Sequence, residues 1–197
     1  MSHPHGPLLV LGIGNILLRD EGIGVQVVRA LRGLSDRGDV ELPPGTSLLD
    51  GGTLGLGLLP LISDARAVLL VDAVDLGRAP GAVEVMHGDA LRRAQAGHVS
   101  PHRAGLGPGA GIGHPAGIGD LLATAQLMGV LPEAVALVGV QPSEIAVGLE
   151  LTEPVRAALP TAVETTLDEL WRLEAVAPSP RPGSSVACGH QVEGATA

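Results

Sequence analysis

The chain of 197 residues and 19.8 kDa has the size of one domain with a sizeable core, and its 45% hydrophobic content excludes a disordered acidic chain. With one Trp, no Phe and no Tyr, the chain lacks the aromatic residues on which recognition of single-stranded nucleic acid depends. Its net charge of −9 also repels phosphate backbones. We therefore expect no nucleic-acid partner.

Strand-like and helix-like patterns alternate along the chain. The apolar run from Pro7 to Ile13 predicts a strand buried on both faces, and apolar residues at helical spacing predict a helix from Asp20 or Glu21 to Gly33. Further strands are predicted over 47–49, 67–71, 82–86 and 134–140, and further helices over 54–62, 117–129 and 153–175. This alternation predicts an α/β fold with a mostly parallel sheet.

The predicted elements lie within residues 7–177, which we expect to form a single domain. Residues 1–6 are expected to be a flexible N-terminus, and residues 178–197 a low-complexity, disordered tail. The single Cys188 excludes an intrachain disulfide framework and a multi-cysteine metal site. The apolar run over 8–18 is too short to span a membrane. We expect a cytoplasmic monomer with no membrane partner.

Polar side chains follow three of the predicted strands. Asn15, Asp20 and Glu21 follow the first strand, Asp50 follows the second, and Asp72 follows the third. Ligands of open α/β sheets bind beyond the carboxyl ends of the strands, so these side chains mark a candidate site. A structural role is the alternative: Asp20 and Glu21 suit the start of a helix, and Asp72 suits the capping of neighbouring backbone.

The glycines after the first strand do not form a nucleotide-binding motif. A dinucleotide fingerprint that starts at Gly12 and Gly14 requires a third glycine at position 17, where this chain has Leu17. Asp20 and Glu21 would repel a pyrophosphate, and the chain has no lysine for a Walker motif. The glycines are therefore expected to serve a tight backbone turn.

Two kinds of chemistry fit the remaining candidates. A Glu, an Asp and a His at the mouth of the sheet form an oxygen- and nitrogen-rich metal site with open positions. Alternatively, Asp20 or Glu21 forms a hydrolytic carboxylate pair with Asp72. His102 and His114, which precede the predicted helix over 117–129, are the candidate histidines.

A family resemblance starts from the same glycine motif. Leu-Gly-Ile-Gly-Asn-Ile-Leu-Leu-Arg-Asp-Glu-Gly-Ile-Gly-Val (11–25) resembles the opening of the [NiFe]-hydrogenase maturation endopeptidases. Leu-Asp-Gly-Gly-Thr-Leu-Gly (49–55), Val-Asp-Ala-Val (71–74) and Leu-Val-Gly-Val-Gln-Pro (137–142) are similar to later segments of that family, in the same order. The resemblance covers about residues 7–175 and implies a three-layer α/β sandwich with a twisted, mostly parallel sheet flanked by helices.

The resemblance also implies an activity. Members of the family remove a C-terminal peptide from the precursor of a [NiFe]-hydrogenase large subunit after nickel insertion, and they recognise the bound nickel. The chain is thus expected to be an aspartic-type or metal-dependent endopeptidase that meets nickel in its substrate and uses no nucleotide. One alternative is a non-proteolytic nickel carrier or scaffold in hydrogenase maturation, and another is a nucleotide-binding α/β domain.

The resemblance assigns the site residues by position. Glu21 and Asp72 are implied as the catalytic residues and, together with a histidine, as the nickel contacts. The family has Ser-Pro-His, then Gly-Leu, and an Asp six residues after the His. His102 matches Ser-Pro-His and Gly-Leu, whereas His114 has Asp120 six residues later.

We take His114 as the nickel contact and His102 as its reserve, because a ligand held by the following helix is the better fixed of the two. Asp20 and Asp50 are expected to lie behind the contacts and to orient them or the glycine turn.

Overall fold

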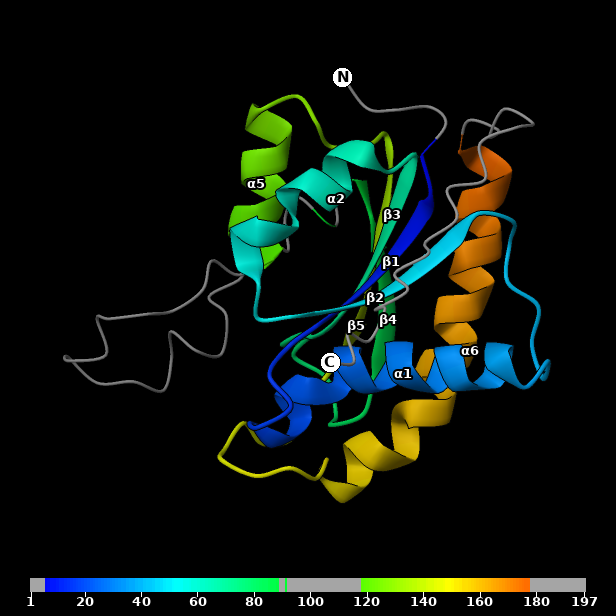
Figure 1. Ribbon diagram of the computed structural model, residues 1–197. Helices are drawn as coiled ribbons and strands as arrows, with labels where there is room; N and C mark the ends of the chain where they lie inside the picture. Colours follow the sequence, from blue (N-terminus) through cyan, green and yellow to red (C-terminus); the bar gives the residue numbers. More distant parts are fainter. Residues whose placement is uncertain (1–5, 89–90, 92–117, 178–197) are drawn as a thin grey trace, which may run out of the picture.

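The computed structural model describes residues 6–88, 91 and 118–177 (Figure 1). Residues 1–5 of the predicted N-terminus, the candidates His102 and His114, and the predicted tail over 178–197 lie outside the described residues. The described elements are, in chain order, β1 (Leu8–Ile13), the 3-10 turn η1 (Arg19–Gly22), α1 (Ile23–Asp36), β2 (Thr46–Gly52), the 3-10 turn η2 (Gly55–Leu58), α2 (Leu59–Asp64), β3 (Ala67–Ala73), β4 (Val83–His87), α5 (Ile118–Leu127), β5 (Ala134–Val140) and α6 (Glu153–Val176).

Five strands form one sheet in the order β2-β1-β3-β5-β4. β1 pairs in parallel with β2 and β3, β3 pairs in parallel with β5, and β4 joins the edge antiparallel to β5. The expected mostly parallel sheet is confirmed. The three central strands carry near-continuous apolar runs, as strands covered on both faces must.

Helices cover both faces of the sheet. Figure 1 shows α1 and α6 on one side and α2 and α5 on the other. Each face has its own aliphatic core: Val27, Leu69 and Leu170 belong to the α1–α6 side, and Leu70 and Leu122 belong to the α2–α5 side. The three-layer sandwich is therefore confirmed. Among the described residues, no helix combines the length and apolar character needed to cross a membrane.

Two predicted helices differ from the observed ones. α1 continues past Gly33 to Asp36, because a glycine inside a helix costs only about 1 kcal/mol and Leu34 still packs against the core. The helix predicted over 54–62 is divided into η2 and α2, with Gly55 at a φ of 51° where the first turn begins. The other elements agree with the prediction to within a few residues at each end, apart from β2, which starts earlier and runs on to Gly52.

The direction in which successive strands are added to the sheet reverses at β1. After β1 the chain crosses to β2 on one side, and after β2 it crosses to β3 on the other side of β1. The carboxyl ends of β1 and β3 are therefore a topological switch point, which is where open α/β sheets bind their ligands.

The first turn of α1 lies unusually close to this end of the sheet. A Cβ on Gly24 would stand 2.1 Å from the carbonyl oxygen of Val71 in β3 and 2.4 Å from that of Ile13 in β1. A Cβ on Gly12 would stand 2.4 Å from the carbonyl oxygen of Gly24. These glycines therefore allow helix and strand backbones to touch, and the contact brings the start of α1 to the switch point.

This packing predicts opposite effects for two Gly→Ala substitutions in α1. Gly24→Ala places a methyl group against rigid backbone and should lower the free energy of unfolding by about 1–3 kcal/mol or more. In Gly33→Ala the new methyl group contacts only the flexible end of Arg37, at 3.4 Å. This substitution should raise the free energy of unfolding by roughly 0.5–1 kcal/mol, since alanine favours the helix. Urea unfolding of both variants measures the difference, and equal effects would contradict the close contact.

Candidate active site

A glycine turn connects β1 to η1. Gly14 has a φ of 125°, a conformation that residues with side chains rarely adopt, and its N–H donates to the carbonyl oxygen of Gly52 at 3.0 Å. Asn15 continues the turn, with its Oδ1 accepting from the N–H of Leu17 at 2.9 Å. A Cβ on Gly14 would stand 1.8 Å from the carbonyl oxygen of Glu21. The turn thus packs directly on the backbone of Glu21, and the expected role of the glycines is confirmed.

The structure brings Glu21 and Asp72 together at the switch point. Glu21 is 7% exposed, lies in η1 just beyond β1, and has a buried Oε2 atom. Asp72 is the penultimate residue of β3, the strand that η1 contacts. Its Oδ1 accepts the N–H of Ala73 at 2.8 Å, so the capping of neighbouring backbone is also observed.

The surroundings favour a protonated Asp72. The pKa of the Asp72 carboxyl is raised to about 8, chiefly by burial and to a smaller extent by the negative charge of Glu21, while the hydrogen bond from Ala73 acts in the opposite direction. The two acidic groups therefore lie close enough for the charge of one to act on the other. A cation at this position would be attracted by both groups and would displace the proton from Asp72.

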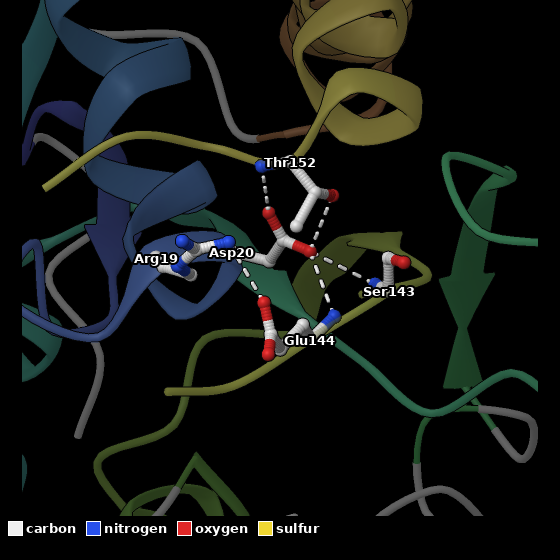
Figure 2. A network of polar contacts seen from close by, with 5 residues as sticks. All are labelled: Arg19, Asp20, Ser143, Glu144 and Thr152. Atoms are coloured by element: carbon white, nitrogen blue, oxygen red, sulfur yellow. Dashed lines mark hydrogen bonds and ion pairs between the residues drawn. The ribbon is translucent and has the colours of Figure 1, made fainter. Parts of the chain in front are cut away.

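Asp20, next to Glu21 in the chain, lies in a different set of contacts, with Ser143, Glu144 and Thr152 (Figure 2). Its carboxylate is fully buried and accepts from the backbone N–H groups of Ser143 and Glu144, both at 2.9 Å, and of Thr152 at 2.7 Å. The hydroxyl of Thr152 adds a fourth bond at 2.8 Å. The alternative that Asp20 caps the helix that follows it is wrong: neither η1 nor α1 has a side-chain cap, and Asp20 instead binds Thr152, the residue before α6.

Asp50 lies inside β2 and not beyond it. Its carboxylate forms an ion pair with Arg29 of α1 at 2.8 Å. Asp50 thus contacts α1, on one face of the sheet. An orienting role for Asp50 stays a prediction.

Two groups that hold the site were missed by sequence reasoning. Gln141 follows β5, and its Oε1 accepts from the N–H groups of Leu76 at 2.7 Å and Arg78 at 3.3 Å, which fixes the loop after Asp72. Thr152 binds Asp20. A signal existed for each: Gln141 lies in the Val-Gln-Pro segment, and Thr152 precedes Glu-Pro at a helix start. Neither signal names the partner, since the partners lie more than 60 residues away.

The surroundings of Asp72 predict a pH-dependent stability. The pKa of Asp72 is higher in the folded chain than the ordinary value of 3.8, so the folded state holds a proton that the unfolded state loses. Its contribution is neutral below about pH 4 and becomes increasingly unfavourable as the pH rises towards 8. Asp72→Asn keeps an acceptor for Ala73 and removes the charge. Its melting temperature should therefore exceed that of the wild type by a margin that widens from pH 4.5 to 8.

Expressed as free energy of unfolding, the difference between Asp72→Asn and the wild type should grow by at most on the order of 1 kcal/mol per pH unit. Asp75→Asn is the matched control, because Asp75 is an exposed carboxylate three residues away. A difference between Asp72→Asn and wild type that stays constant over this pH range would contradict the raised pKa.

The chain is similar in sequence to proteins of one known family. The family described as hydrogenase maturation protease matches residues 25–109 and 111–169. The hydrogenase expression/formation protein HoxM of Azotobacter vinelandii is 38% identical over 164 residues, which cover 83% of this chain and 72% of HoxM. The hydrogenase 2 maturation protease of Escherichia coli K12 is 34% identical over 164 residues, which cover 83% of this chain and 90% of that protein.

The fold is shared as well. The solved structure of the hydrogenase maturating endopeptidase HybD from E. coli superposes with a TM-score of 0.68 at 32% identity, covering 84% of this chain and 93% of HybD. Sequence and fold therefore agree, and the chain belongs to the hydrogenase maturation protease family.

Proposed function

We propose that this protein is an endopeptidase that removes a C-terminal peptide from the precursor of a [NiFe]-hydrogenase large subunit after nickel insertion, and that Glu21 and Asp72 contact the nickel that the precursor carries. Peptide-bond hydrolysis during hydrogenase maturation is what the names of the E. coli relatives state. The proposed contact with nickel rests on the residues of the site.

The observation that carries the proposal is the placement of Glu21 and Asp72 at the switch point. Burial and, to a smaller extent, the charge of Glu21 raise the pKa of Asp72, because the two carboxyl groups repel one another when both are ionised. A divalent cation relieves this repulsion. Carboxylate oxygen and imidazole nitrogen are suitable ligands for a borderline ion such as nickel.

The third contact is proposed to be His114, with His102 as the reserve. The described residues hold no group of three His, Cys, Asp or Glu that could bind a metal by themselves. This agrees with a metal that arrives as part of the substrate, because the precursor supplies ligands of its own and the protease adds only a few. Nickel then acts as a checkpoint: the precursor binds well only when it carries the ion.

The carboxyl pair admits two hydrolytic roles. In an aspartic-type reaction, the raised pKa of Asp72 suits it to be the acid towards the scissile bond, and Glu21 is proposed as the group that acts on water. In a metal-dependent reaction, nickel instead polarises the scissile carbonyl while the two carboxylates hold the ion. Both roles need Glu21 and Asp72 at the same place.

The test compares nickel-loaded with nickel-free precursor, with cleavage followed as a mass shift. Wild-type protein should process the loaded precursor and leave the nickel-free one intact. Glu21→Gln and Asp72→Asn should each lower processing by more than about 100-fold while remaining folded, since each removes a group that contacts the reacting substrate. Asp75→Asn should process normally.

Equal cleavage of loaded and nickel-free precursor would contradict the checkpoint. A precursor that is bound but keeps its length would show a nickel carrier or scaffold in place of a protease. His114→Ala should abolish processing and His102→Ala should not. The opposite result would show that His102, and not His114, contacts the nickel.

A further inference from the structure

The segment over 141–152 connects β5 to α6 and lies along the η1 turn. Leu18 forms a parallel bridge with Gly148, in which the N–H of Arg19 donates to the carbonyl oxygen of Gly148 at 3.0 Å and the N–H of Gly148 donates to that of Leu17 at 2.9 Å. An exposed ion pair joins Arg19 to Glu144 at 2.7 Å. Exposed ion pairs contribute little, so the buried carboxylate of Asp20 is the main polar tie between the two segments.

The site around Asp20 accepts only a carboxylate. Its Oδ2 receives three donors, from Ser143, Glu144 and the hydroxyl of Thr152, and its Oδ1 receives the N–H of Thr152 (Figure 2). All four groups around the carboxylate act as donors, and its two oxygens, which can only accept, form a hydrogen bond with each of them. An amide of the same shape would turn an NH₂ group towards at least one of these donors, which makes Asp20→Asn a disruptive change despite its small size.

Glu21 is held between this network and the glycine turn. On one side, the preceding residue Asp20 is anchored to segment 141–152. On the other side, the carbonyl oxygen of Glu21 lies against Gly14, and its N–H donates to Leu18 at 3.3 Å. The backbone of Glu21 is thus held on both sides, and its place near Asp72 depends on both contacts.

We infer that Asp20 is a positioning residue for the nickel-loaded precursor: through segment 141–152 it fixes Glu21 opposite Asp72, and it touches neither the precursor nor its metal. This inference rests on the proposed function, because it acts through the contact of Glu21 with nickel. Segment 141–152, which contributes no metal contact, thereby contributes indirectly to recognition of the substrate.

The test measures the Kd for nickel-loaded precursor in a double-mutant cycle of Asp20→Asn and Glu21→Gln. Asp20→Asn should raise the Kd about tenfold in the wild-type background, as a displaced contact group does, and less than about twofold when Glu21→Gln is already present. A merely structural role of Asp20 would weaken binding by the same factor in both backgrounds. That additive result would overturn the inference.

Thr152 provides milder variants in case Asp20→Asn does not fold. Thr152→Val removes the hydroxyl bond and keeps the backbone bond, so it should raise the Kd about threefold, while Thr152→Ser should restore the wild-type value. Thr161→Val on the exposed face of α6 is the control and should have no effect. Equal affinities for Thr152→Val and Thr152→Ser would overturn the inference. A Glu21→Gln variant that binds loaded precursor like the wild type would instead overturn the proposed function.

Discussion

The structure depends on how three acidic side chains are accommodated at one end of an apolar sheet. Burying a carboxylate is costly unless donors or a cation compensate for the lost water. Asp20 meets this condition within the chain, through four hydrogen bonds. Asp72 meets it differently, because burial and the nearby charge of Glu21 raise its pKa and so favour its protonated form. The fold thus provides Asp20 with donors from its own chain, whereas Asp72 favours a proton or a positive ion.

Backbone contacts make this arrangement possible. The close approach of Gly24 to β1 and β3, and of Gly14 to Glu21, leaves no room for side chains between the first turn of α1 and the sheet. As a result, Glu21 stands beside Asp72 at the switch point created by the strand order. Gly12 and Gly14, whose spacing begins like a nucleotide motif, here lie beside an acidic site, and a site of that charge suits a cation better than a phosphate.

Much of the fold could be predicted from local patterns, whereas the contacts of the site could not. The apolar runs of β1, β3 and β5 and the helical period of α1 stand out because each reflects burial of its own residues. The strand order and the antiparallel β4 depend on pairing between distant segments, which composition does not encode. The partners of Asp20 likewise lie 123 to 132 residues further along the chain, so its sequence neighbours favoured capping of α1. That Glu21 and Asp72 lie at the same end of the sheet could be predicted, because both follow apolar strands; their roles stay a prediction.

Glu21 and Asp72 interact electrostatically, and the charge of Glu21 contributes to the raised pKa of Asp72. A titration of the Asp72 carboxyl carbon by NMR, in the wild type and in the Glu21→Gln variant, measures this interaction most directly. We predict a pKa of about 8 in the wild type and a lower pKa once the charge of Glu21 is removed, with part of the elevation remaining because burial is its larger cause. The same pKa in both proteins, or an ordinary value in the wild type, would show that the two groups do not interact in this way.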